Sequence, residues 1–207
     1  MKGRFITLEG VEGSGKSTNL EFLCDLLERS NLPFIKTREP GGTDLAEALR
    51  EIMLSEWTEE VSGLTEVLLV FAAREQHLKN VILPKLKSGV WVLSDRFTDA
   101  TYAYQGEARG ISVSIIEKLE EWVQVGLRPD LTLFLDLPPE QSEARMRGRK
   151  KDRMELEGLA FFEKVRQGYL ERLRDNKQVK VVEASRSLDE VQAELEKHLM
   201  AFIHENS

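Results

Sequence analysis

The chain has little cysteine and no long apolar run, and these absences exclude several classes of protein. A single cysteine, Cys24, rules out an internal disulfide and is typical of proteins in a reducing compartment. The longest uninterrupted apolar run, residues 67–73, is far shorter than the ~20 residues that a membrane-spanning helix needs. No targeting segment is visible at the N-terminus. We therefore expect a cytoplasmic protein with no membrane partner.

An excess of positive charge is also missing. The 207 residues include 29 Lys or Arg and 36 Asp or Glu, so the formal net charge is −7. An acidic total disfavours broad binding to nucleic acid, whose phosphates are held chiefly by Lys and Arg, and we expect no such partner. The composition is 41% hydrophobic, with no repeat, low-complexity tract or linker. It predicts one globular domain over residues 1–207.

Short β-rich runs alternate with longer helical patterns along the chain. The predicted strands are residues 4–9, 33–37, 90–94, 131–136 and 179–183. The helical patterns are residues 17–29, 44–54, 64–88, 112–126, 158–175 and 188–203. Mostly apolar strands separated by helices indicate a parallel sheet that is covered on both faces. We expect an α/β fold with three layers, α/β/α, around a five-stranded parallel sheet.

The first predicted strand leads into a glycine-rich loop. Residues 10–17, GVEGSGKS, match G-x-x-x-x-G-K-[ST] between a strand and a helix. Such a loop turns backbone N–H groups toward an anion at the positive end of the helix. A glycine-rich turn that only caps the helix is the alternative. We predict a P-loop NTPase fold whose ATP contacts are Gly10, Val11, Glu12, Gly13, Ser14, Gly15, Lys16, Ser17 and Thr18.

The motifs of a guanine-nucleotide switch are absent. No Asp is followed by Gly three positions later, and Asn176-Lys177 lacks the Asp of N-K-x-D. A kinase of small phosphorylated acceptors instead needs arginines for the acceptor phosphate and a basic flap over the triphosphate. Arginines follow two predicted strands, in residues 37–42 and 94–97. Residues 144–153 hold six of the 29 basic residues and could form the flap, or simply a solvated helix face.

Several stretches together resemble the bacterial-type thymidylate kinases, which are P-loop nucleoside monophosphate kinases. They are REPGGT at 38–43, FAAREQH at 71–77, SDRFTDATYAYQG at 94–106, RPDLTLFLDLP at 128–138 and DRMELEGLAFFEKVRQGYL at 152–170. The resemblance implies transfer of the γ-phosphate of ATP to dTMP, giving dTDP and ADP for dTTP biosynthesis. It also implies Mg²⁺, a homodimer and a lid at about residues 140–155.

The resemblance also assigns residues to dTMP by their position in the motifs. Phe71 is expected to stack on thymine and Arg74 to donate to its O4, while either Tyr102 or Tyr104 lies against the sugar. Glu12 is expected to accept a hydrogen bond from the 3′-hydroxyl of dTMP. The predicted dTMP site comprises Glu9, Glu12, Arg38, Phe71, Arg74, Arg96, Thr101, Tyr102, Tyr104 and Gln105.

The reaction itself is expected to need positioning and charge neutralisation rather than an acid–base residue. Ser17 and Asp95 are the predicted Mg²⁺ ligands, with Asp136 as a reserve. The lid is expected to supply the positive charge that compensates Glu12. The predicted catalytic residues are Lys16, Arg96, Arg153, Arg149 and Arg147, with Arg145 as a further lid candidate.

Other interpretations remain open at this point. Phe71 could be a core residue, and Arg74 and Gln105 could lie on the surface. The chain also departs from the family pattern, because Gly106 is followed by Glu107-Ala108-Arg109 instead of small glycines. The alternative functions are a kinase of another nucleoside monophosphate or of a deoxynucleoside, and a non-catalytic nucleotide-dependent interaction module.

Overall fold

The computed structural model describes residues 2–148 and 152–206. Its sheet has five strands, all parallel, in the order β2-β3-β1-β4-β5. The strands are β1 (Phe5–Gly10), β2 (Phe34–Arg38), β3 (Trp91–Asp95), β4 (Leu131–Asp136) and β5 (Val179–Glu183). The prediction of an α/β fold with a five-stranded parallel sheet is confirmed.

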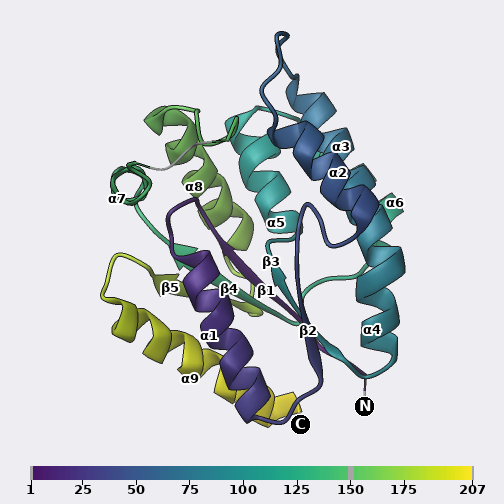
Figure 1. Ribbon diagram of the computed structural model, residues 1–207, viewed down its shortest axis with the longest axis vertical. Helices are drawn as coiled ribbons and strands as arrows, with labels where there is room; N and C mark the ends of the chain where they lie inside the picture. The colour runs from purple at the N-terminus through teal and green to yellow at the C-terminus, as the bar shows by residue number, and fades with distance from the viewer. Residues whose placement is uncertain (1, 149–151, 207) are drawn as a thin grey trace.

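Helices connect the strands and cover the sheet (Figure 1). The predicted helix at residues 64–88 is observed as α3, η1 and α4, where η1 is a π-helical segment. The short helical elements at residues 98–108 and 139–145 were not predicted, since they span too few residues to show a period. The helical elements are α1 (Lys16–Arg29), α2 (Asp44–Leu54), α3 (Gly63–His77), η1 (Leu78–Ile82), α4 (Leu83–Lys87), α5 (Thr98–Thr101), η2 (Tyr102–Ala108), α6 (Val113–Gln124), α7 (Pro139–Arg145), α8 (Leu159–Leu173) and α9 (Leu188–Asn206).

The central strand β1 is buried on both of its faces. Ile6 and Leu8 pack in the cluster that includes α1 and α9, which lie side by side (Figure 1). Phe5, one position out of phase, packs with η1, α4 and Phe97 instead. Burial of each such side chain contributes about 1.5–3 kcal/mol. Because successive strand residues point to opposite faces, an almost continuously apolar strand needs helices on both sides.

The helices that flank the site begin at capping hydroxyls. Thr43 Oγ1 accepts the backbone N–H of Ala46 at the start of α2, and Ser62 Oγ accepts that of Thr65 at the start of α3. Each cap satisfies one of the free N–H groups of a helix start and is worth about 1 kcal/mol. In the described part of the chain, no helix combines the length and the apolar character needed to cross a bilayer.

Candidate active site

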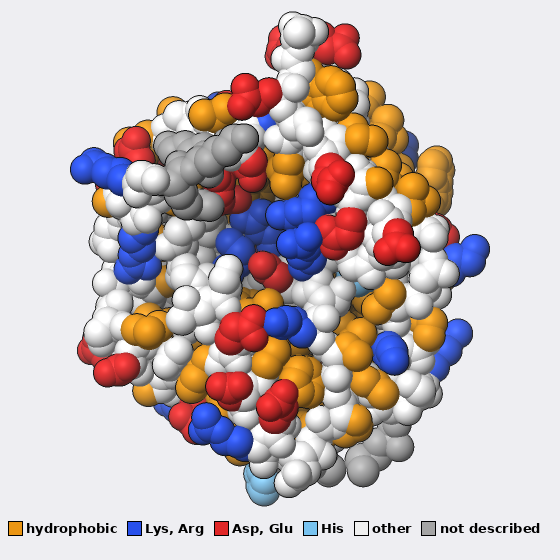
Figure 2. Space-filling view, viewed as in Figure 1, with side chains coloured by type: hydrophobic (Ala, Val, Ile, Leu, Met, Phe, Trp, Pro, Cys, Tyr) orange, Lys and Arg blue, Asp and Glu red, His pale blue; other side chains and the backbone are white. Residues whose placement is uncertain are grey.

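A cavity of about 440 Å³ lies at the carboxyl ends of β1, β2 and β3. Ligands of open α/β folds bind at this edge because the loops that follow the strands converge there. Its lining combines residues from the glycine-rich loop, the REPGG segment, α3, the end of β3 and the lid. Figure 2 shows Lys and Arg side chains gathered in the hollow at the centre of the view.

The glycine-rich loop has the conformation expected of a phosphate-binding loop. Gly13 has φ 71°, and a Cβ there would lie 2.9 Å from the Ser142 carbonyl oxygen, so only glycine fits. The Nζ of Lys16 donates to the carbonyls of Gly10 and Val11, each at 3.0 Å. Burial and the nearby Arg96 guanidinium lower the pKa of Lys16 to about 8. The lysine therefore lies folded over the loop, beside Ser17 and Thr18, which line the same cavity.

Glu12 is part of a buried polar cluster with Arg96 and Tyr104. Its Oε1 accepts from Arg96 Nη2 at 2.6 Å, and its Oε2 accepts from the Tyr104 hydroxyl. Burial alone would raise the pKa of Glu12, but Arg96 and Lys16 outweigh burial and lower it to about 2. The carboxylate is thus ionised at neutral pH. We expected the lid to compensate this charge, whereas the structure pairs it with Arg96 next to β3.

Arg96 has an unusual backbone conformation that directs it to this cluster. Its φ is 68°, in the left-handed region that non-glycine residues rarely adopt, at a cost of about 1–3 kcal/mol. The Ser94 hydroxyl donates to the Arg96 carbonyl, and the Arg96 N–H donates to the Leu8 carbonyl. These bonds hold the strained turn. Such strain is common at functional sites.

Two further arginines reach the cavity from β2 and α2. Arg38 pairs with Glu47 through Nε at 3.2 Å and Nη2 at 2.6 Å. Arg50 donates to the Pro40 carbonyl, and burial together with Arg38 and Arg96 lowers its pKa below the ordinary value. Arg50 was not predicted as a site residue. The signal available was its position in the predicted helix directly after the REPGG segment.

Asp95 and Ser17 line the same cavity from the ends of β3 and the glycine-rich loop. The Oδ1 of Asp95 is buried and has no hydrogen-bond partner among the described residues. A buried carboxylate oxygen without a donor is costly unless a cation or a ligand binds it. The described residues contain no group of three or more His, Cys, Asp or Glu that could hold a metal by themselves.

Arg74, Thr101 and Gln105 meet on the α3 side of the cavity. Arg74 is 1% exposed, with its Nε 2.6 Å from Glu39 Oε2 and its Nη2 3.0 Å from Thr101 Oγ1. Gln105 donates to the buried carboxylate of Glu66 at 3.1 Å. The alternative that Arg74 and Gln105 are surface residues is therefore wrong. Glu39, which lines the cavity and binds Arg74, was not predicted.

Three predicted dTMP contacts do not line this cavity. Phe71 packs in the apolar cluster with Val67 and Ile116, so its alternative interpretation as a core residue agrees with the structure, and Val70 faces the cavity instead. Tyr102 belongs to the same cluster, whereas Tyr104 lines the cavity.

Glu9 is the third of these predicted contacts. It is fully buried and accepts from the backbone N–H of Phe97 at 2.7 Å and from the Tyr169 hydroxyl at 2.8 Å. Burial and the nearby Asp99 raise the pKa of Glu9 to about 8. The structure therefore places it beneath the site, between β1 and α8.

The described part of the lid lies on the glycine-rich loop. The Ser142 hydroxyl of α7 donates to the Glu12 carbonyl at 2.6 Å, and Arg145 Nη1 lies 3.4 Å from the Gly13 carbonyl. Arg147 is exposed and does not line the cavity. Arg149 lies outside the described residues. Of the lid arginines that the structure describes, Arg145 is the one that reaches both the loop and the cavity.

Arg153, near the end of the lid, is bound by residues of α2 and α3. It donates to the Met53 carbonyl at 2.9 Å and to Glu66 at 2.8 Å. Glu66 is fully buried and also pairs with Arg109, which in turn binds Glu157 at 2.6 Å. These ion pairs attach residues 153–157 to α3 and to Arg109, which follows η2.

Asp136, the reserve metal ligand, is paired with another side chain. Both of its carboxylate oxygens accept from Arg166 of α8, at 2.7 and 2.9 Å, and Asp136 does not line the cavity. The structure therefore favours Asp95 over Asp136 as the carboxylate available to a ligand of the cavity.

Comparisons with known proteins agree with this geometry. A family model described as thymidylate kinase matches residues 8–195. The chain is similar to proteins named thymidylate kinase from Pseudomonas putida (strain GB-1), 54% identical over 95% of this chain and 94% of the relative, and from Neisseria gonorrhoeae (strain NCCP11945), 54% identical over 96% and 97%. A third, from Marinomonas sp. (strain MWYL1), is 49% identical over 96% of this chain and 95% of the relative.

Proposed function

The chain belongs to the thymidylate kinase family and transfers a phosphoryl group from ATP to dTMP, and we propose that the cavity at the carboxyl ends of β1, β2 and β3 is where it does so. The observation that supports this proposal is the shared cavity. Lys16 of the glycine-rich loop, the arginines that follow β2 and β3, and the buried Arg74 all line it. It therefore offers a donor side and an acceptor side.

On the donor side, the backbone N–H groups of the glycine-rich loop bind the ATP phosphates, and Lys16 neutralises the β- and γ-phosphates. Arg145, whose Nη1 lies 3.4 Å from the Gly13 carbonyl, adds positive charge from the lid. We keep Arg147, Arg149 and Arg153 as catalytic candidates that the closing of the lid would have to bring to the phosphates. Transfer then depends on positioning and charge neutralisation, because phosphoryl transfer needs little covalent participation from the protein.

On the acceptor side, three guanidinium groups hold the phosphate of dTMP. Arg38, Arg50 and Arg96 all line the cavity, and a planar guanidinium can bind a phosphate through two parallel hydrogen bonds. Glu12 keeps Arg96 beside the glycine-rich loop. At this place one arginine can bind both the phosphate of dTMP and the γ-phosphate of ATP. We retain the proposal that Glu12 also accepts a hydrogen bond from the 3′-hydroxyl of dTMP, with Tyr104 beside the sugar.

The thymine base lies against α3 in this proposal. Val70, Arg74, Thr101 and Gln105 line that end of the cavity. Among the described residues, Nη1 of Arg74 is buried without a hydrogen-bond partner, and it can donate to an acceptor such as O4 of thymine. We assign the apolar contact with the base to Val70, since Phe71 packs in the core.

Mg²⁺ fits the oxygen ligands that the cavity offers where its ATP side meets its dTMP side. The hydroxyl of Ser17 and the unpartnered Oδ1 of Asp95 are hard oxygen ligands in the same cavity. Mg²⁺ is usually held by one or two carboxylates together with substrate phosphates, so a cluster of protein ligands is not required. When bound, the ion would neutralise charge on the phosphate oxygens.

We also propose a homodimer in which α2, α3 and α6 form the interface. α3 contacts both α2 and α6, and the three helices have large apolar side chains on their outer surface, among them Ile52, Leu68 and Trp122, which are 45%, 52% and 74% exposed. Exposed apolar patches of this kind mark protein–protein interfaces. We further propose a single kinase domain with a lid at about residues 140–155, located in the cytoplasm.

A coupled assay of ADP release tests the acceptor. The wild-type enzyme should use dTMP in preference to dUMP, dCMP, dGMP and AMP. Arg50→Ala should raise KM for dTMP by about 10- to 100-fold while KM for ATP changes little, because the lost contact is a charged hydrogen bond to the acceptor. Arg50→Lys in the same assay is a control that keeps the charge but not the planar fork of donors. Equal effects of Arg50→Ala on both KM values would contradict the acceptor assignment.

A further inference from the structure

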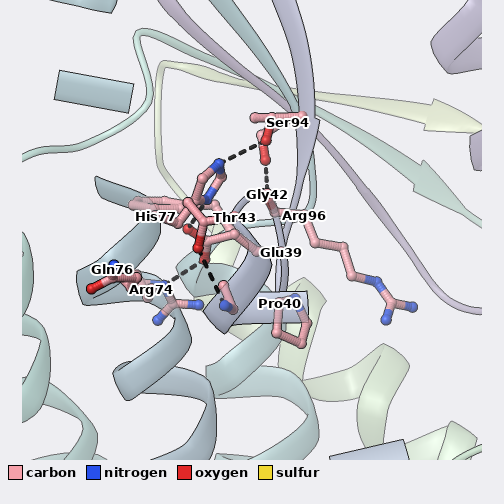
Figure 3. Close-up of polar contacts among 12 residues, drawn as sticks. Glu39, Pro40, Gly42, Thr43, Arg74, Gln76, His77, Ser94 and Arg96 are labelled. Atoms are coloured by element: carbon pink, nitrogen blue, oxygen red, sulfur yellow. Dashed lines mark hydrogen bonds and ion pairs between the residues drawn. The ribbon is translucent and has the colours of Figure 1, made fainter. Parts of the chain in front are cut away.

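We infer that Glu39 is a positioning residue for recognition of the thymine base: its buried carboxylate, oriented by His77, holds the Arg74 guanidinium so that Nη1 is left for the ligand. This inference rests on the proposed contact between Arg74 and the base. It adds two residues, Glu39 and His77, to which no role has been assigned above. Figure 3 shows both side chains beside Arg74, next to the loop that contains Pro40 and Gly42.

The first step is the pair of Glu39 and Arg74. Glu39 follows β2, and its backbone N–H donates to the Asp95 carbonyl at 2.9 Å. Its Oε2 lies 2.6 Å from Arg74 Nε, and the two side chains are 2% and 1% exposed. A buried ion pair of this kind rarely adds net stability, since both charges lose their hydration. Its retention at the wall of a ligand cavity therefore favours a role in orienting Arg74.

The second step is the contact that orients Glu39. His77 is fully buried, with Nδ1 3.1 Å from Glu39 Oε1 and Nε2 2.6 Å from Thr37 Oγ1. A neutral imidazole with its proton on Nδ1 donates to Glu39 and accepts from the Thr37 hydroxyl, so every group has a complementary partner. A Cβ on Gly42 would clash with His77 Nε2, which shows how closely the loop packs on the ring. Neither Glu39 nor His77 can rotate without losing a buried hydrogen bond.

The third step concerns the donor group of Arg74 that its neighbours leave available. Its Nε is bound by Glu39 and its Nη2 donates to Thr101 Oγ1 at 3.0 Å. The guanidinium carbon lies 4.8 Å from the ring centre of Phe71 and 5.1 Å from that of Phe97, which restricts its plane. Nη1 is therefore the donor group that the described residues do not engage.

A fixed donor at this position distinguishes bases by their substituent at carbon 4. Thymine has an oxygen there and accepts the hydrogen bond, whereas a cytosine base has an amino group and would leave two donors facing each other. Sites built around a buried polar group reject the ligand that leaves that group unpaired. A guanidinium that could rotate would lose part of this discrimination, so the selectivity depends on Glu39 as well as on Arg74.

The test compares KM for dTMP with the inhibition constant of 5-methyl-dCMP, a competitor with the same sugar and phosphate. Glu39→Gln keeps the shape of the side chain but removes its charge. We expect KM for dTMP to rise roughly 10- to 100-fold, KM for ATP to change less than about threefold, and the preference for dTMP over 5-methyl-dCMP to fall about tenfold or more. Loss of folded protein alone would lower kcat and leave both the KM values and this preference unchanged.

Matched variants separate the inference from the proposal on which it rests. Arg74→Lys should lose the preference for dTMP; if it does not, the proposed role of Arg74 fails. If Arg74→Lys loses the preference and Glu39→Gln keeps it, the inference about Glu39 is overturned while the role of Arg74 stands. Glu47→Gln is the control, because it removes a carboxylate that pairs with Arg38 at the phosphate site rather than at the base. It should weaken the binding of dTMP and of 5-methyl-dCMP equally.

His77 gives a second, independent variant pair if Glu39→Gln does not fold. His77→Asn can keep a donor near the position of Nδ1, whereas His77→Leu removes it. We expect His77→Leu to reduce the preference for dTMP about as much as Glu39→Gln would, and His77→Asn to restore most of it. Equal preference in His77→Leu, His77→Asn and the wild-type enzyme would refute the inference.

Discussion

Glu9 makes the stability of this protein depend on pH in a way that can be measured. The residue is fully buried beneath the site, and burial together with Asp99 raises its pKa from 4.5 to about 8. Between these two values the folded chain keeps a proton that the unfolded chain has released. The contribution of Glu9 to folding is therefore complete below about pH 4.5 and is lost as the pH rises through about 8.

The magnitude follows from the two pKa values. A separation from 4.5 to about 8, at about 1.4 kcal/mol for each pH unit, amounts to about 5 kcal/mol over the whole range. Between about pH 5 and about pH 7.5 the expected loss is about 3 kcal/mol. Glu9→Gln removes the titration but keeps an oxygen that can accept from Phe97 N–H, while its amide nitrogen can donate to the Tyr169 hydroxyl oxygen as a protonated carboxyl group would. From about pH 5 to about pH 7.5, the free energy of unfolding of Glu9→Gln should thus rise by about 3 kcal/mol relative to that of the wild type.

Urea unfolding at several pH values measures this difference. Protein concentration must be held constant, because association also stabilises the folded state. Glu163→Gln, at an exposed position on α8, is a control whose difference from the wild type should stay within about 0.5 kcal/mol. If the difference between Glu9→Gln and the wild type is the same at about pH 5 and about pH 7.5, Glu9 is ionised in the folded protein and the reasoning is refuted.

Three other outcomes are expected. Arg145→Ala should lower kcat by about 10²-fold with little change in KM for dTMP, and an unchanged kcat would contradict its role on the donor phosphates. Glu66→Gln weakens the ion pairs that attach residues 153–157 to α3, so trypsin should cleave after Arg147 faster than in the wild type; equal cleavage rates would argue against such an attachment. Leu68→Glu should shift the enzyme toward monomer in sedimentation velocity, whereas Met200→Glu, at a similarly exposed position on α9, should not; a dimer in both variants would place the interface elsewhere.

The strands and long helices of this fold could be predicted because their physical signals are local. The apolar runs at residues 131–136 and 179–183 form β4 and β5 with the predicted bounds. The glycine-rich loop could be predicted as well, since its backbone requires glycines at set spacings. The short elements α5, η2 and α7 could not, because they depend on packing against α8 and the glycine-rich loop rather than on a periodic pattern.

The site was harder to predict where the orientation of a side chain decides its role. Phe71 and Val70 are adjacent on α3, and a difference of about 100° around the helix separates the core from the cavity. Position in a motif does not resolve neighbouring residues this finely. Glu39 and Arg50 were missed for a different reason. The role of Glu39 depends on its contact with Arg74, which is distant in sequence, and that of Arg50 depends on its burial. Neither a distant contact nor burial can be predicted from a single residue.

The cluster of Glu12, Arg96 and Tyr104 has a consequence for how this enzyme can change over time. Its members come from three separate segments of the chain, yet each hydrogen-bonds to the other two. Replacing one of them alone leaves a buried charge or hydroxyl group without its hydrogen-bond partner. A single substitution therefore destabilises the protein even where simultaneous replacement of all three would be tolerated. Adaptation of this kinase to a new acceptor is therefore expected to begin at Val70, an apolar residue of the cavity wall whose replacement leaves no polar group without its partner.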